Sequence, residues 1–178
     1  RPLGASPRRT LSRAPRSMKS LLILRHAEAA PASEHVPDRH RPLTAEGAAQ
    51  ARRLGEAMRQ RGRAFERALC ASALRARETA EAVIAAGGYA AQPELSDRLY
   101  NAAGEEMFRL LQEQKGGSRL LLVAHMPGVT ELLSLLVTDE GDLSLVFQAG
   151  TLAEIAIDLE RWDALAPGAG ALRLLLPP

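Results

Sequence analysis

The chain has 178 residues, 46% of them hydrophobic, which suits one folded domain with a substantial core. Aromatic residues make up only 3%, so the core must consist of Leu, Val, Ile and Ala. No apolar run approaches the roughly 20 residues that a membrane-spanning helix needs. The single cysteine, Cys70, excludes an internal disulfide, and its apolar neighbours favour a buried, inert thiol. We therefore expect a cytoplasmic protein with no membrane partner.

Basic charge gathers at the amino end of the chain. Residues 1–17 hold five Arg and no acid, and removing those five charges from the net +2 leaves −3 for the rest. The segment contains Pro, Gly and Ser without periodicity, which predicts a disordered basic tail before a domain spanning residues 18–178. Met18 follows directly and is a candidate start. Organellar targeting by the tail stays open, whereas the acidic balance of the domain argues against a nucleic-acid partner.

Short apolar runs alternate along the chain with segments whose apolar residues recur at helical spacing. The predicted strands span residues 20–24, 67–71, 119–124, 151–159 and 171–176. The predicted helices span residues 45–61 after the N-cap Thr44, 73–86, 104–115 and 127–137. Residues 29–43 are expected to form a polar loop, and residues 89–103 to be irregular. The alternation predicts an α/β fold with three layers (αβα), a mostly parallel central sheet and helices on both faces.

Two of the predicted strands end in a histidine. "LLILRH" ends at Arg25 and His26, and "RLLLVAH" ends at His125. The second strand leads into a helix whose first turn holds Arg75. Because ligands of open α/β sheets bind beyond the carboxyl ends of the strands, we expect these side chains to converge.

The convergence of arginines and histidines indicates a site for a phosphoryl group. Guanidinium groups match phosphate oxygens, and helix N-termini add amide donors. A histidine pair can supply a nucleophile and a donor to the transferring group. With arginines supplying positive charge, no metal or other cofactor is required. Taken singly, each residue is more often structural. His35 and His40, in the Pro-bounded loop, are expected to be solvent-exposed.

Four motifs, in this order, resemble those of the histidine phosphatase superfamily, which has the phosphoglycerate-mutase-like fold. They are "LRHAEA", "RPLTAEGAAQA", "LCASALRARETAE" and "LLLVAHMPGVTELL", and they cover residues 20 to about 137. Within the superfamily, the short length and "RPLT" resemble the SixA-type phosphohistidine phosphatases.

The resemblance implies a role for each residue at the predicted site. His26 would be the nucleophile that is transiently phosphorylated. Arg25 and Arg75 would bind the phosphoryl oxygens, and His125 would donate to them. Arg41 resembles an additional arginine that SixA-type enzymes carry near the phosphate.

The chain departs from the family pattern where the mutase branch carries a glutamate as general acid. That region reads "RLYNAAGEE", with Asn101 where the acid would fall. Glu105, Glu106 and Asp38 are substitutes, although we expect each to be a solvated surface residue. An alkoxide leaving group benefits from a positioned acid. The nitrogen of a phosphoramidate can take its proton from water, so a pocket without an acid suits phosphohistidine.

We therefore expect a monomeric, metal-independent phosphatase whose partner is a phosphorylated substrate, most simply a phosphohistidine-bearing protein. A broad small-molecule phosphomonoesterase on the same fold is the alternative. A non-catalytic phosphate-binding module is disfavoured, because binding alone would not need a nucleophile. The predicted loops contain no long insertion to form a lid, which favours an open site.

Overall fold

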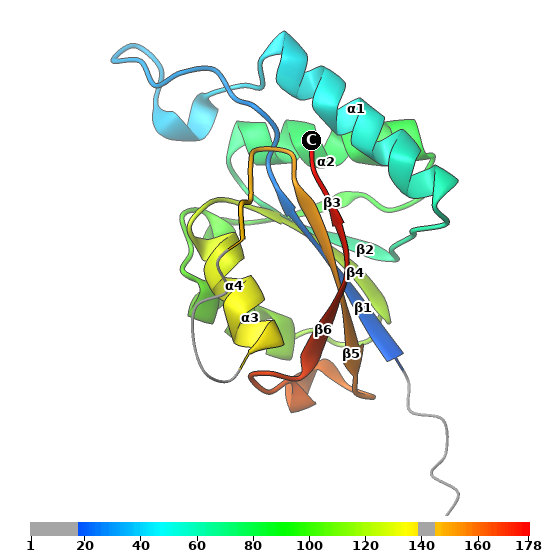
Figure 1. Cartoon of the computed structure of the whole chain (residues 1–178). Coiled ribbons are helices and arrows are strands. Elements are labelled where there is room, and N and C mark those ends of the chain that lie inside the picture. The colour runs from blue at the N-terminus through cyan, green and yellow to red at the C-terminus, as the bar shows by residue number, and fades with distance from the viewer. Residues whose placement is uncertain (1–17, 139–144) are drawn as a thin grey trace, which may run out of the picture.

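The computed structural model describes residues 18–138 and 145–178, so the basic tail predicted for residues 1–17 lies outside the described part. The described strands form one six-stranded sheet in the order β3-β2-β4-β1-β5-β6 (Figure 1). Their bounds are β1 (Met18–Arg25), β2 (Arg67–Ala71), β3 (Pro93–Ser96), β4 (Arg119–Ala124), β5 (Leu152–Asp158) and β6 (Gly170–Leu176).

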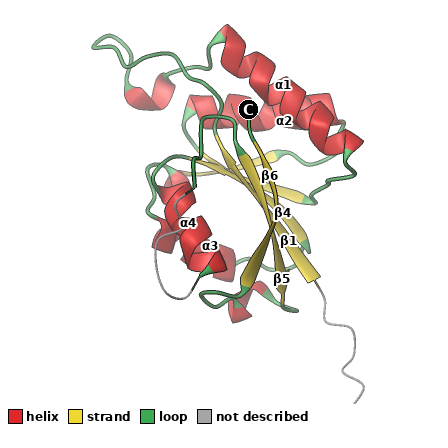
Figure 2. Ribbon diagram, in the orientation of Figure 1, coloured by secondary structure: helices red, strands yellow, loops and turns green. Residues whose placement is uncertain are grey.

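Helices cover both faces of this sheet (Figures 1 and 2). Helix α1 packs on α2 on one face, and α3 packs on α4 on the other. The bounds are α1 (Ala45–Gln60), α2 (Leu74–Gly87), α3 (Gly104–Gln112) and α4 (Gly128–Val137), with 3-10 turns η1 (Asp38–His40), η2 (Asp97–Leu99) and η3 (Trp162–Ala164). The predicted αβα architecture is confirmed. Within the described residues, no helix combines the length and apolar character needed to cross a bilayer.

The strand directions bring three strand ends to one edge of the sheet. Strand β4 pairs in parallel with β1 and with β2, and β3 pairs in parallel with β2. Strand β5 runs antiparallel to β1, and β6 antiparallel to β5. The sheet is therefore mostly parallel, as predicted. The carboxyl ends of β1, β2 and β4 share an edge with the amino end of β5.

The centre of the sheet is apolar throughout because helices exclude water from both of its faces. Leu21 to Leu24 of β1 and Leu120 to Val123 of β4 are at most 1% exposed. Cys70 of β2 is also fully buried, and burial raises the pKa of its thiol to about 12. This agrees with the inert thiol expected from its neighbours.

The prediction for residues 89–103 was wrong, because this segment contains β3 and η2. Strand β3 is a sheet edge that begins at Pro93 and exposes Glu94 and Leu95. Such a strand carries neither an apolar run nor an alternating pattern, so its sequence reads as a loop. Helix α3 also ends at Gln112, earlier than predicted.

Gly47, in the first turn of α1, lies against the backbone that follows His26. A Cβ atom at this position would come within 1.9 Å of the carbonyl oxygen of Glu28. That oxygen accepts a hydrogen bond from the Thr44 amide, where the helix begins. The close approach explains why the motif "RPLTAEGAAQA" has glycine at position 47.

We predict that Gly47→Ala lowers the free energy of unfolding by about 1–3 kcal/mol, because a methyl group would push the Glu28 segment away. Urea denaturation measures the loss. The control is Ala45→Ser on the exposed side of the same turn, which should change stability by less than about 0.5 kcal/mol. An equal loss of unfolding free energy in the two variants would contradict the close packing of Gly47 on Glu28.

Candidate active site

The two histidines predicted at the strand ends lie side by side. In the β1–β4 register Arg25 stands opposite Ala124, so His26 and His125 each follow a paired residue. Their ring centroids are 5.1 Å apart, with the rings inclined at 60°. His125 is only 4% exposed, and its ring also meets the edge of Tyr100 at a centroid distance of 5.9 Å.

Hydrogen bonds of its own segment fix the orientation of His26. Its Nδ1 lies 2.7 Å from the carbonyl oxygen of Ala27, which assigns the proton to Nδ1 and leaves a lone pair on Nε2. The His26 amide donates to Ala124, which ties this segment to β4. The Ala27 amide donates to Oγ1 of Thr79, and that hydroxyl donates to the carbonyl of Arg75.

The surroundings keep both rings neutral. Burial, together with the charges of nearby arginines, lowers the pKa of His26 from 6.5 to about 4. Burial, with His26 and Arg75 beside it, lowers the pKa of His125 to about 3. An unprotonated imidazole is the form that attacks an electrophile. At neutral pH, His26 therefore carries a nucleophilic lone pair on Nε2.

Arg25 and Arg75 are each held at a terminal nitrogen by a main-chain carbonyl. Nη1 of Arg25 donates to the Phe147 carbonyl at 2.8 Å, and Nη1 of Arg75 donates to the Asp38 carbonyl at 2.7 Å. Arg75 lies in the first turn of α2 and is 3% exposed. In the described part of the chain, Nε of both arginines and both ring nitrogens of His125 are buried without a hydrogen-bond partner. Buried polar groups of this kind call for a ligand or ordered water.

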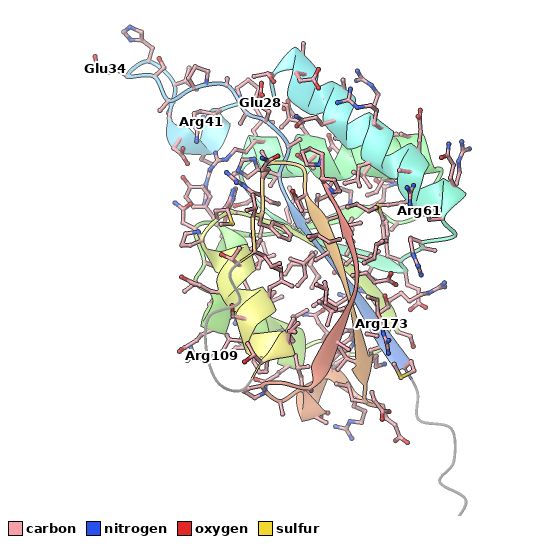
Figure 3. The ribbon with its side chains drawn as sticks, viewed as in Figure 1. Glu28, Glu34, Arg41, Arg61, Arg109 and Arg173 are labelled. Atoms are coloured by element: carbon pink, nitrogen blue, oxygen red, sulfur yellow. The ribbon has the colours of Figure 1, made fainter. Side chains whose placement is uncertain are left out.

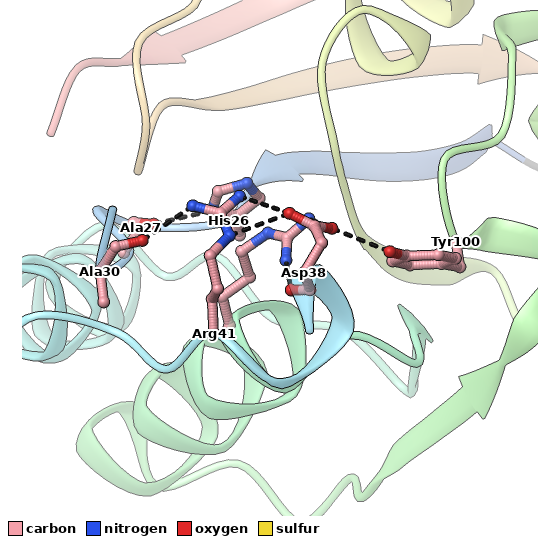
Figure 4. Close-up of polar contacts among 7 residues, drawn as sticks. His26, Ala27, Ala30, Asp38, Arg41 and Tyr100 are labelled. Atoms are coloured by element: carbon pink, nitrogen blue, oxygen red, sulfur yellow. Dashed lines mark hydrogen bonds and ion pairs between the residues drawn. The ribbon is translucent and has the colours of Figure 1, made fainter. Parts of the chain in front are cut away.

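Arg41 reaches the same region from the loop between β1 and α1. Its Nη1 donates to the Ala30 carbonyl at 2.8 Å, and its Nε donates to Asp38 at 2.9 Å (Figure 4). Figure 3 shows Arg41 at the base of this loop, with Glu34 at its outer end. The charge of Arg41 contributes to the low pKa of His26, which places it within electrostatic reach of the histidine pair.

The remaining predicted residues fall into two groups. His35 and His40 are exposed, as expected. Glu105 and Glu106 lie at the start of α3 and pair with Arg109 and Arg98, respectively, so the expected surface role is confirmed.

Asp38 is exposed, as expected, but it is not an isolated surface residue. Its carboxylate accepts hydrogen bonds from Arg41, Arg75 and Tyr100, which the sequence did not predict. Arg75 lies 37 positions and Tyr100 lies 62 positions from Asp38 in the chain, so no local pattern reveals that these donors meet. Sequence reasoning also assigned no role to Tyr100.

Thr79 is a further residue whose role sequence reasoning missed. It lies in the motif "LCASALRARETAE", in which a role was predicted for Arg75 alone. Its fully buried hydroxyl joins α2 to the segment after His26.

No group of three or more His, Cys, Asp or Glu side chains in residues 18–138 and 145–178 is placed to hold a metal ion. The arrangement instead offers two guanidinium groups, a third nearby and two neutral imidazoles at one edge of the sheet. Such donors suit an oxyanion with two negative charges. The fold and the site define an α/β enzyme of the phosphoryl-transfer class.

Comparison with known proteins gives the family. The model of the histidine phosphatase superfamily (branch 1) matches residues 21–114, over half of the chain. An uncharacterized protein of Picosynechococcus is 31% identical over 114 residues, which cover 62% of this chain and 68% of that protein. The chain belongs to the histidine phosphatase superfamily and is a hydrolase of the phosphatase class.

Solved structures of similar fold include several phosphatases. A proposed phosphohistidine phosphatase SixA from Nakamurella multipartitia has a TM-score of 0.78 and 29% identity, covering 92% of this chain and 98% of that one. A proposed α-ribazole-5′-P phosphatase from Escherichia coli has a TM-score of 0.62 and 20% identity, covering 88% and 96%. The fold is therefore SixA-like, while phosphatases of similar fold are described with different substrates.

The low pKa values of His26 and His125 predict that the protein loses stability in mild acid. The unfolded chain binds protons on these histidines near pH 6.5, whereas the folded chain does so only near pH 4 and pH 3. Stability is therefore complete above about pH 6.5 and falls as the pH drops toward 4. Urea denaturation between pH 7 and pH 4 measures this slope.

The slope should become shallower in His125→Gln and stay unchanged in His40→Gln, because His40 is exposed and outside the pair. A wild-type slope in His125→Gln would contradict the neutral, buried imidazole at position 125.

Proposed function

We propose that the protein is a metal-independent phosphatase that forms a phosphohistidine intermediate on His26 and acts on phosphohistidine borne by proteins. The observation that carries the proposal is the state of His26. Its Nδ1 is bonded to the Ala27 carbonyl at 2.7 Å, and burial among arginines lowers its pKa to about 4. Nε2 is thus an oriented, unprotonated nucleophile at neutral pH.

In the first proposed step, Nε2 of His26 attacks phosphorus, and the bond between phosphorus and the leaving group breaks. Arg25, Arg75 and a neutral His125 donate to the equatorial oxygens, whose charge is spread in the transition state. Arg41 adds positive charge from the loop. In the second step, water attacks phosphorus, the bond to Nε2 breaks, and inorganic phosphate and neutral His26 result.

The leaving group is proposed to be nitrogen because the described residues offer no suitable acid. Burial alone would raise the pKa of Asp38, but hydrogen bonds from Tyr100, Arg41 and Arg75 outweigh it and lower that pKa to about 2. Asp38 is therefore ionised at neutral pH and has no proton to give. An alkoxide would lack the protonation it needs, whereas the nitrogen of phosphohistidine takes a proton from solvent.

The rim of the site supports a protein substrate. Three exposed apolar side chains lie on segments that carry site residues or their partners: Val36 (38% exposed), Met126 (36%) and Val146 (78%). Met126 directly follows His125, and Val146 precedes the carbonyl that holds Arg25. Exposed apolar groups beside a charged site suit contact with another protein surface.

The test is turnover, with chelator present, of a phosphohistidine-bearing protein, phosphoramidate and an alkyl phosphate monoester. We predict rapid cleavage of both P–N substrates and a weak ester rate. His26→Ala should lose at least about 10³-fold of the P–N rate, because the nucleophile is absent. Acid-labile, base-stable phosphate should be trapped on wild-type protein and be missing from His26→Ala.

The matched control is His40→Ala, which removes an exposed histidine of the nearby loop and should keep wild-type turnover. Ester cleavage as fast as P–N cleavage would overturn the substrate assignment and favour a small-molecule phosphomonoesterase. Wild-type activity in His26→Ala would eliminate the proposed nucleophile.

A further inference from the structure

The carboxylate of Asp38 joins three side chains around the site. Oδ2 accepts from Nη2 of Arg75 at 3.0 Å and from the hydroxyl of Tyr100 at 2.8 Å, and Oδ1 accepts from Nε of Arg41 at 2.9 Å (Figure 4). Nη2 of Arg41 also lies 2.8 Å from Oδ1. The main-chain carbonyl of Asp38 accepts from Nη1 of Arg75. Asp38 therefore binds Arg75 through both its carbonyl and its carboxylate, and binds Arg41 through its carboxylate.

The positive charge of Arg75 is neutralised by its ion pair with Asp38. Its side chain is 4% exposed, and a buried guanidinium is costly unless a negative charge is paired with it. Among the described residues, Asp38 is the only carboxylate that forms an ion pair with Arg75. The hydrogen bond to Asp38 also raises the pKa of Tyr100, so its phenol stays protonated and continues to donate.

A carboxylate bonded to two phosphate-binding arginines could instead be a competitor that occupies the phosphoryl position. The distribution of free donors argues otherwise. Asp38 accepts from the two terminal nitrogens of Arg75 and leaves its buried Nε without a partner among the described residues. Arg25 shows the same pattern there, since Nη1 donates to a carbonyl and Nε has no described partner, and Asp38 does not bond to His125. The donors left for a phosphoryl group are those that Asp38 does not use.

We propose that Asp38 is a positioning residue, whose carboxylate and carbonyl hold Arg75 and Arg41 in the orientation that binds phosphoryl oxygens, while Tyr100 fixes the carboxylate. The inference rests on the proposed function, because it takes these arginines as ligands of the phosphoryl group. It assigns Asp38 no proton transfer.

The test measures the affinity of the wild type and variants for inorganic phosphate by calorimetry, together with KM and kcat for phosphoramidate. Asp38→Ala should weaken phosphate binding and raise KM about 10- to 100-fold, since charge-assisted hydrogen bonds to both arginines are lost. The change in kcat should be much smaller. Asp38→Asn keeps an oxygen acceptor and the main-chain carbonyl, so its affinity should lie between that of Asp38→Ala and that of the wild type.

Two further variants keep the inference testable if Asp38→Ala folds poorly. Tyr100→Phe retains the carboxylate but removes its third donor, and should weaken phosphate binding by a smaller factor than Asp38→Ala. Asp97→Asn is the matched control, because Asp97 ties the same turn to η2 through Arg39 without contacting Arg75 or Arg41. It should keep wild-type affinity.

Four results would overturn the inference. Tighter phosphate binding in Asp38→Ala would identify a competing anion. Unchanged binding would show that the carboxylate does not position the arginines. A loss of kcat alone would assign Asp38 to the chemical step. An equal loss of phosphate affinity in Asp97→Asn would show that Asp38 only anchors the loop.

Failure of the proposed function has a separate signature in the wild-type protein. Absent P–N turnover, with phosphate binding that still falls in Asp38→Ala, would reject the substrate and keep the positioning role. Normal P–N turnover in the wild type, with unchanged phosphate binding in Asp38→Ala, would keep the proposed substrate and reject the positioning role.

Discussion

The parallel pairing of β1 with β4 is the contact on which the site depends. Both strands are apolar and are covered on both faces, so a shift in their register would disturb core packing along the whole length of the pair. The same register sets Arg25 opposite Ala124 and brings His26 beside His125. Packing of aliphatic side chains thus determines the spacing of two imidazoles that lie far apart in the chain.

Burial then sets the chemistry of those groups. A solvent-exposed imidazole would be partly protonated near neutral pH. An exposed guanidinium would donate its hydrogen bonds to water. Here the strand ends are sheltered, and the histidines stay neutral beside two arginines. The protein therefore keeps guanidinium charge and unprotonated imidazoles in one place. The carboxylate of Asp38, on a loop, balances part of that charge.

Features set by local pattern could be predicted from the sequence, and those set by distant contacts could not. Apolar runs ending in histidine located the strand ends, and the helical spacing located the packed helices. Strand β3 was missed because an exposed edge strand starting with proline has no apolar signature. The pairing of Asp38 with Arg75 and Tyr100 was missed because it joins η1 to residues that are distant in the chain. Four ordered motifs indicated the family, but motifs do not reveal which residue holds an arginine in place.

Within the described part of the chain, Nε of Arg25, Nε of Arg75 and both ring nitrogens of His125 have no hydrogen-bond partner, which links the stability of the fold to ligand binding. An anion that satisfies them binds the folded chain and has no equivalent site in the unfolded one, so mass action makes stability rise with its concentration. Inorganic phosphate is the product of the proposed reaction. The melting temperature of such an enzyme would follow the phosphate level of its surroundings, and the protein would be most open to proteolysis where phosphate is scarce.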